Sequence, residues 1–276
     1  MTEFHKYHGA GNDFIMINNL KGEIKFTPDY IKFICDRHFG IGADGVILLE
    51  SSNKADCFMN YYNSDGTEAE MCGNGARCTA KFFLEQTTLL TGGQDSNLKE
   101  LNIDTRAGIK NIKVNADGTF SVNMGTPIFE SCDFPSESIN LEGFTFDCIS
   151  MGNPHTVTMV DNLDKIDIKS IGPKIENDPH FPNKINMEFV EKIKDDYYKV
   201  KVWERGCGET LACGTGACAV YAILSKLSSS RTVLEELEEK EITLEFPGGK
   251  LFLLENREGQ IILRGPATFV FKGEII

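Results

Sequence analysis

The stretch MCGNGA at residues 71–76 decides the fold, because it recurs as ACGTGA at residues 212–217. Both stretches have the pattern Cys-Gly-x-Gly-Ala, and their cysteines, Cys72 and Cys213, are 141 positions apart. A single Cys-Gly-x-Gly is more often a glycine-rich turn followed by a buried cysteine than a reactive site. Packing alone does not explain why two such motifs would both keep the cysteine, so the pair points to function.

The same offset of 141 produces further matches without a gap. The matched pairs are Gly11 with Gly152, Asn12 with Asn153, and Glu68 with Glu209. Several matches in one register indicate an internal duplication, which predicts two similar domains facing each other with a ligand cleft between them. We expect domains at residues 1–117 and 118–264.

Alternating apolar and polar residues between Gly, Asn and Pro turns predict a strand-rich chain. The clearest predicted strands are residues 103–105, 120–123, 197–202, 242–246 and 261–263. Predicted helices cover residues 28–38, behind a Thr27 N-cap and with proline in the first turn, then 73–86 and 214–226.

Three connecting segments have compositions of their own. Residues 115–118 are the expected crossover between the domains, and residues 91–97 (TGGQDSN) are an expected surface loop. The polar and acidic residues 228–240 predict a solvated helix or loop with no catalytic role.

Charge and cysteine content exclude several classes of protein. A formal net charge of −13 disfavours broad attachment to nucleic acids or anionic membranes, although a local anion site remains possible. The N-terminus lacks a signal-peptide pattern and no apolar run reaches about 20 residues, so we expect a soluble, cytoplasmic protein.

The nine cysteines form an odd set, and we expect reduced thiols. We interpret Cys35, Cys57, Cys132 and Cys148 as small buried hydrophobic residues without a reactive role. None of the nine forms a Cys-x2-Cys pair and no histidines have zinc spacing, so no metal site is expected. The motif glycines also lack the third glycine of a dinucleotide fingerprint and the Gly-Lys-Ser/Thr of a P-loop.

A cysteine at the start of a helix lies where free N–H groups and the helix dipole stabilise an anion, either a thiolate or a bound carboxylate. Two such thiols, Cys72 and Cys213, would supply a base and an acid on opposite faces of an amino-acid α-carbon. Donors aimed at the carboxylate in a closed, dry site would stabilise the carbanion. The hypothesis is therefore epimerisation by two cysteines.

Several motifs together are highly specific, and on them the chain closely resembles the diaminopimelate epimerase family from end to end. They are HGAGNDF (8–14), RHFGIGADG (37–45), NSDG (63–66), MCGNGARC (71–78), GNPH (152–155), ERG (204–206) and ACGTGA (212–217). The resemblance implies an α+β fold of two pseudo-symmetric domains, each a mixed β-barrel around a central helix, with a final strand at about 265–276 returning to the first domain. It also implies a PLP-independent isomerase, without cofactor, that interconverts LL- and meso-diaminopimelate in lysine and peptidoglycan precursor biosynthesis.

The resemblance assigns roles residue by residue. It implies that Cys72 and Cys213 are catalytic and that His155 and Glu204 tune the pKa values of their thiols. The implied substrate-binding residues are Asn12, Asn63, Gly73, Asn74, Asn153, Asn186, Glu204, Arg205, Gly214 and Thr215. Arg37, Asp44 and Arg77 are interpreted as structural ion-pair residues.

Two positions depart from the family pattern. Some members carry glutamine where Gly45 stands, so any contact there must be through backbone, and Phe271 replaces a tyrosine of the dimer interface. A homodimer is still expected. Two alternatives stay open: an epimerase of another amino acid on the same scaffold, and a non-catalytic amino-acid-binding module. The pair Glu204-Arg205 favours a long substrate with charged groups at both ends.

Overall fold

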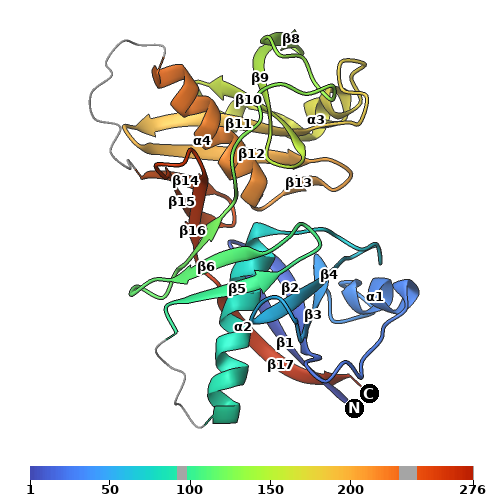
Figure 1. The fold of residues 1–276 in the computed structure, drawn as a ribbon. Coiled ribbons are helices and arrows are strands. Elements are labelled where there is room, and N and C mark those ends of the chain that lie inside the picture. The colour runs from blue at the N-terminus through green and yellow to red at the C-terminus, as the bar shows by residue number, and fades with distance from the viewer. Residues whose placement is uncertain (92–97, 230–240, 276) are drawn as a thin grey trace. The chain divides into compact units, whose positions relative to one another are not determined.

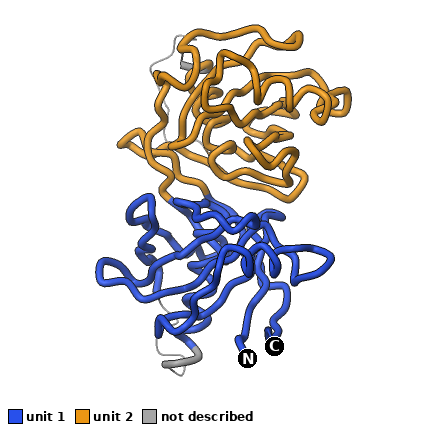
Figure 2. The backbone as a smooth tube through the Cα atoms, turned by 90° about the vertical axis from the view of Figure 1, so that its right-hand side faces the viewer, with its two compact units in different colours: residues 1–122, 264–276 blue, residues 123–263 orange. Residues whose placement is uncertain are grey.

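The structure is a computed structural model that describes residues 1–91, 98–229 and 241–275. The chain divides into two compact units (Figure 2). Unit 1 comprises Met1–Val122 together with Arg264–Ile276, and unit 2 comprises Asn123–Leu263. The extents expected for the two epimerase domains, 1–117 and 118–264, remain predictions.

In unit 1, strands surround one long helix, α2, which contacts β1 to β6 (Figure 1). The elements are β1 Thr2–Gly9, β2 Asn12–Asn18, α1 Pro28–Cys35, β3 Gly45–Glu50, β4 Cys57–Asn63, α2 Gly73–Thr91, β5 Glu100–Asp104, β6 Lys110–Val114, β7 Phe120–Asn123 and β17 Thr268–Ile275. The last strand, β17, pairs antiparallel with the first, β1.

In unit 2, the helix α4 contacts β9, β10, β11 and β15 (Figure 1). The elements are β8 Ile139–Leu141, β9 Phe144–Ser150, β10 Pro154–Val160, η1 Leu163–Lys165, α3 Ile168–Glu176, β11 Asn186–Lys194, β12 Tyr197–Glu204, β13 Gly208–Thr210, α4 Gly214–Ser229, β14 Ile242–Phe246, β15 Gly249–Glu255 and β16 Ile261–Gly265.

The two units repeat one pairing scheme. Strands β2 to β6 pair in the order parallel, antiparallel, parallel, antiparallel. Strands β10, β11, β12, β14 and β15 pair in the same order. The strand registers also agree. Phe14 pairs with Gly45 in unit 1, and the residues 141 positions later, His155 and Asn186, pair in unit 2. The predicted duplication and α+β fold class are confirmed.

Each unit buries its own apolar core between strands and helices. In unit 1 the core includes Phe4, Ile15 and Ile34, and in unit 2 it includes Phe146 and Phe189, whose rings meet edge to face at 5.9 Å. Such aromatic contacts add about 1 kcal/mol beyond the burial of their surface. The cores therefore hold the central helices, and with them the two cysteine motifs, in place.

The helix α1 confirms the predicted cap but ends earlier than predicted. The Thr27 hydroxyl accepts from the Tyr30 N–H at 3.2 Å, and Pro28 begins the helix. The helix stops at Cys35 because Asp36 adopts an extended backbone (φ −63°, ψ 129°). The Asp36 carboxylate then accepts from the N–H groups of residues 38 and 39, which satisfies the turn that follows.

Other differences from the predicted elements are local. Helices α2 and α4 begin as predicted, at Gly73 and Gly214, and run to Thr91 and Ser229. Helix α3 was not predicted, because Pro173 lies inside it and resembles a helix breaker. Residues 115–118 form the tight turn of the β6–β7 hairpin, and the crossover between the domains expected there remains a prediction.

Two expected loops can be compared only in part. Thr91 belongs to α2 and residues 228–229 belong to α4, while residues 92–97 and 230–240 lie outside the described part of the chain. Cys35, Cys57 and Cys148 are buried as predicted, but Cys132 is exposed, so its prediction as a buried residue is wrong. Among the described residues, no helix has the length and apolar composition needed to cross a bilayer.

Candidate active site

Each motif cysteine directly precedes the central helix of its unit. The Gly75 N–H donates to the Cys72 sulfur at 3.4 Å, and the Gly216 N–H donates to the Cys213 sulfur at the same distance. In both units the sulfur thus takes the place of an N-cap oxygen, accepting from the third residue of the helix. This position, at the positive end of the helix dipole, favours a thiolate.

In unit 1, the thiol contacts an asparagine whose amide is held in one orientation. The Asn12 Nδ2 group donates to Asp44 Oδ2 at 2.8 Å, so the Asn12 Oδ1 atom is left facing the helix. That oxygen accepts from the Cys72 thiol at 3.4 Å and from Asn74 Nδ2 at 3.3 Å. The structure therefore brings together Cys72, Asn12 and Asn74.

Behind Asn12 lies a network of ion pairs. Arg37 donates to both oxygens of Asp13, at 3.1 and 2.7 Å, and to Asp44 at 2.8 Å, while the Lys6 ammonium lies 2.7 Å from Asp13. Burial opposes ionisation of Asp13, but the bonds from Arg37 and Lys6 prevail and hold its pKa at about 2. Burial raises the pKa of Asp44. The ion-pair role predicted for Arg37 and Asp44 agrees with these contacts.

Arg77 is completely buried and supports the start of α2. It donates to Asn74 Oδ1 at 2.7 Å, to the Gly73 carbonyl at 3.3 Å and to the Pro266 carbonyl at 3.1 Å. With Arg77 on its oxygen, Asn74 can present only its Nδ2 group to Asn12.

In unit 2, the thiol is more deeply buried and lies among carboxylates. Cys213 is 5% exposed and its sulfur lies 3.4 Å from Thr215 Oγ1. Burial, followed by the charges of Glu204 and Glu188, raises the pKa of the Cys213 thiol well above its ordinary value. Burial also raises the pKa of Glu204, which hydrogen-bonds Thr210 and Cys213. The predicted neighbours Glu204 and Thr215 are therefore beside Cys213.

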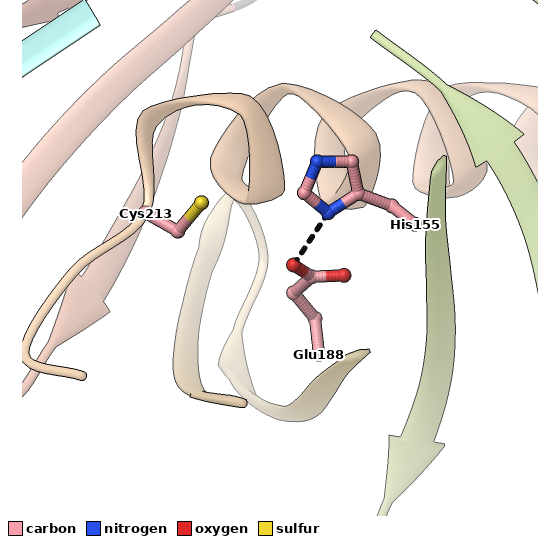
Figure 3. A group of neighbouring side chains, drawn as sticks. All are labelled: His155, Glu188 and Cys213. Carbon is pink, nitrogen blue, oxygen red and sulfur yellow. Dashed lines mark hydrogen bonds and ion pairs between the residues drawn. The ribbon is translucent and has the colours of Figure 1, made fainter. Parts of the chain in front are cut away.

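A ring nitrogen of His155 lies within 4.8 Å of the Cys213 sulfur, and the ring hydrogen-bonds Glu188 (Figure 3) and Asn153. Its Nδ1 atom lies 2.8 Å from Glu188 Oε1, and its Nε2 atom lies 3.1 Å from Asn153 Oδ1. Both His155 and Glu188 are completely buried. Glu188 was not among the predicted site residues, although a carboxylate within the apolar run INMEFV at 185–190 was a signal that could have found it.

The remaining predicted substrate residues are placed less directly. Asn186 donates to the Pro154 carbonyl at 2.7 Å and accepts from the Arg205 N–H at 3.0 Å, so its amide holds the backbone on both sides. The exposed Arg205 guanidinium donates to the Asn183 carbonyl at 2.8 Å. Substrate contacts of these residues remain predictions.

Gly45, the first residue of β3, pairs with Asn63, the last residue of β4. Asn63 donates to Thr67 Oγ1 at 3.1 Å within the turn after β4, and its role in substrate binding remains a prediction. A side chain at Gly45 would meet the Tyr62 carbonyl at 2.5 Å, so this backbone leaves no room for the glutamine of some relatives.

Three donors of unit 2 have the chemistry of a transition-metal site. One nitrogen of His155, one oxygen of Glu188 and the sulfur of Cys213 all lie within 4.8 Å of one another. Sequence spacing did not reveal this trio, since its members come from three separate elements. Against a cation, both ring nitrogens of His155 are already engaged and the N-terminus of α4 points at the sulfur.

Comparison with solved structures identifies the fold. A phenazine biosynthesis protein of the PhzF family from Bacillus anthracis superposes with a TM-score of 0.68 at 21% identity, covering 100% of this chain and 99% of that one. A hydroxyproline epimerase from Agrobacterium vitis, with bound trans-4-hydroxy-L-proline, gives 0.66 at 15% identity, covering 99% and 90%. The fold is thus that of a class that includes amino-acid epimerases.

Sequence comparison is more specific. The profile of the family described as diaminopimelate epimerase matches residues 4–130 and 147–270. The diaminopimelate epimerase of Carboxydothermus hydrogenoformans is 43% identical, covering 99% of this chain and 98% of its own, and that of a Cyanothece species is 42% identical, covering 98% of each. The chain belongs to the diaminopimelate epimerase family, as its sequence motifs predicted.

Proposed function

We propose that this protein is a PLP-independent epimerase that interconverts LL-2,6-diaminopimelate and meso-diaminopimelate, supplying lysine and peptidoglycan precursors. The observation that carries the proposal is the pair of cysteines, Cys72 and Cys213, each at the start of its unit's central helix in a chain of this family. Such a reaction requires one base and one acid, and the duplication supplies two thiols at equivalent positions of the two units.

The proposed reaction moves one proton at each step. One cysteine, as thiolate, removes the α-proton, and the bonding pair stays on carbon as a carbanion conjugated with the carboxylate. The other cysteine, as thiol, then delivers its proton to the opposite face, which leaves the first thiol protonated and the second ionised. The N–H groups at residues 73–74 and 214–215 would bind the reacting carboxylate and stabilise the carbanion.

The surroundings of Cys213 support a role for its thiol as the proton donor. The raised pKa of Cys213 keeps that thiol protonated when the site is empty, so it is poised as the acid. His155 and Glu204 lie beside it and would tune its ionisation: an imidazolium favours the thiolate and a carboxylate disfavours it.

The remaining contacts would define the substrate. Arg205 presents an exposed guanidinium for the distal carboxylate, and Glu204 can pair with an ammonium group. Asn12, Asn63, Asn153 and Asn186 would complete the binding site with amide donors and acceptors. A diamino dicarboxylic acid uses all of these groups, whereas a small or cyclic amino acid would leave several unpaired.

We also propose a cytoplasmic homodimer that uses β17. Phe269, Val270 and Phe271 are 41%, 50% and 45% exposed, an unusual run of apolar surface on one strand. A second copy of the chain would cover it. Light scattering should report a dimer for the wild type, and Phe271→Glu should produce monomers; a monomeric wild type contradicts this part of the proposal.

The first test is incubation of the reduced protein with LL-diaminopimelate in D2O. We expect the meso form to appear with one solvent deuterium at the α-carbon, measured by chiral chromatography and mass spectrometry. Exchange on another amino acid but none on diaminopimelate would favour an epimerase of different specificity. Binding of diaminopimelate without any exchange would favour a non-catalytic binding module.

The cysteine variants test the mechanism itself. Cys72→Ala and Cys213→Ala should each lower kcat by at least about a thousandfold, since each removes the acid or base for one face. Circular dichroism and thermal unfolding should show both variants folded. Near-normal turnover in either variant would contradict the two-base mechanism.

A further inference from the structure

The duplication places a charged pair in unit 2 where unit 1 has an apolar pair. The offset of 141 takes His155 onto Phe14 and Glu188 onto Ile47, and all four side chains are completely buried. The strand registers agree, since Met16 faces Ile47 between β2 and β3 as Val157 faces Glu188 between β10 and β11.

The two pairs occupy the same place against the central helix. A Cβ atom at Gly75 would lie 3.1 Å from Ile47 Cδ1, and one at Gly216 would lie 2.3 Å from Glu188 Oε1. The site behind each cysteine can therefore be filled by apolar side chains, as unit 1 shows. A buried ion pair costs desolvation energy that apolar packing avoids, so the charges in unit 2 are not explained by packing.

Both ring nitrogens of His155 lie within hydrogen-bond distance of an oxygen atom. Both ring nitrogens face acceptor oxygens, Nδ1 toward Glu188 Oε1 at 2.8 Å and Nε2 toward Asn153 Oδ1 at 3.1 Å. A ring that donates at both nitrogens is an imidazolium. The carboxylate of Glu188, which is completely buried like the ring, would be the counter-ion of such an imidazolium.

Glu188 itself carries an unusual feature. Its Oε2 atom has no hydrogen-bond partner among the described residues, although it is buried. Buried carboxylates in a purely structural role are normally satisfied at both oxygens, so an unsatisfied one points to a functional site.

We propose that Glu188 is a positioning residue of the Cys213 half of the active site: it keeps His155 doubly protonated and in one orientation, so that a fixed positive charge faces the thiol. This proposal rests on the proposed epimerase function. Glu188 acts through His155, without touching the substrate, because its side chain is buried beneath the start of α4.

The charged and titratable groups around this ring come from four elements. They are Asn153 before β10, Glu188 on β11, Glu204 on β12, and Cys213 with Thr215 and the Gly216 N–H at α4. Glu204 and Glu188 both disfavour a thiolate at Cys213. The imidazolium is the positive side chain in this set, and it offsets their negative charge when the thiol ionises.

The direct test reads the protonation of His155 without turnover. Nitrogen-15 NMR of the ligand-free protein at neutral pH, with His155→Gln to assign the signal, should show both ring nitrogens of His155 protonated. In Glu188→Gln, which keeps the shape of the side chain but removes its charge, His155 should become neutral. A neutral ring in the wild type, or an unchanged imidazolium in the variant, overturns the proposal.

Kinetics then measure the consequence. Glu188→Gln should lower kcat at least about tenfold with KM changed by less than about threefold, and should shift the pH profile of kcat. The matched control is Glu191→Gln on the same strand, whose carboxylate bonds the Leu163 N–H and should leave the profile unchanged. Wild-type kcat and pH profile in Glu188→Gln also overturn the proposal.

The double variant His155→Phe/Glu188→Ile copies the apolar pair of unit 1 into unit 2. It should fold with a melting temperature no lower than that of the wild type, yet lose at least as much turnover as Glu188→Gln. A strong loss of folding would instead make the pair structural and overturn the proposal. The NMR result stands apart from the proposed function, which fails only if the wild type does not epimerise diaminopimelate.

Discussion

The two units build the same scaffold around different electrostatics. In each, an asparagine lies at the turn of a hairpin: Asn12 contacts Cys72 in unit 1, and Asn153 contacts His155 in unit 2. In unit 1 the charges lie behind the asparagine, in the Arg37 network, and the layer under the helix is apolar. In unit 2 the charges of His155 and Glu188 lie directly under the helix.

This difference shows which parts of a duplicated site are constrained by the fold and which by chemistry. Backbone hydrogen bonds to the cysteine sulfur are identical in both units, so the fold alone supplies them. The side chains beneath the sulfur have diverged completely. The two thiols, which would hold different protonation states in the proposed reaction, therefore have different buried neighbours.

The largest contrast is expected between two glycine substitutions. At Gly216 a Cβ atom would displace the Glu188 carboxylate and break its bond to His155, so Gly216→Ala should lower kcat about a hundredfold. At Gly75 the close atoms are Met59 Cε and Ile47 Cδ1, the movable ends of apolar side chains, and Gly75→Ala should change kcat less than about tenfold. The measurement is kcat of both variants. Equal losses of kcat would contradict the proposed difference between the two units.

The two thiols should also differ in reactivity. Cys213 is buried and its pKa is raised, whereas Cys72 is half-buried, so iodoacetamide at neutral pH should modify Cys72 at least about tenfold faster. Peptide mass spectrometry over time gives both rates in one sample. Exposed Cys132 serves as the reactive reference and buried Cys35, whose pKa burial raises to about 12, as the unreactive one. Faster labelling of Cys213 would contradict the proposal that its thiol stays protonated in the ligand-free protein.

The smallest effect concerns stability in acid. The pKa of Asp13 is about 2 in the folded protein against an ordinary 3.8, so its ion pairs stabilise the fold above about pH 4 and are lost as pH falls toward 2. Asp13→Asn should be about 1–2 kcal/mol less stable than the wild type at pH 7, with the gap closing near pH 2.

Unit 2 supplies the control of opposite sign. Burial raises the pKa of Glu204, so ionising it opposes folding and the contribution is lost as pH rises through that pKa. Urea unfolding at pH 7 and pH 2 should therefore show Glu204→Gln at least as stable as the wild type at pH 7. Equal pH dependence for the Asp13 and Glu204 variants would contradict the contrast.

The repeat made most of this fold predictable. A local motif with a fixed offset determined where both central helices begin, and strand alternation located β7 and β14 to the residue. Helix α3 was missed because Gly172-Pro173 suggested a break, yet the offset applied to α1 places a helix there. The boundary errors come from capping by Asp36, which depends on geometry that the sequence pattern does not contain.

The repeat predicted the candidate residues that the two units share, and the family resemblance was needed for His155 and Glu204, whose counterparts at the offset of 141 are Phe14 and Asn63. Cys72 and Cys213 follow from the repeat. The counterpart of Glu188 in unit 1 is Ile47, so the repeat does not single out Glu188. Its importance comes from contacts with His155 and Gly216, which lie 33 and 28 positions away in the sequence. Such long-range polar contacts form only when separate strands and a helix come together.

The pairing of β17 with β1 has a consequence for biosynthesis. Strand β1 precedes its partner β17 in the chain, with all of unit 2 between them, so β1 leaves the ribosome well before β17. Unit 2 is translated completely before β17, so it can fold while unit 1 still exposes the edge of β1. Unit 1 is therefore expected to complete its folding after unit 2. A nascent chain that still lacks β17 would expose the edge of β1, and chaperones would be expected to bind it.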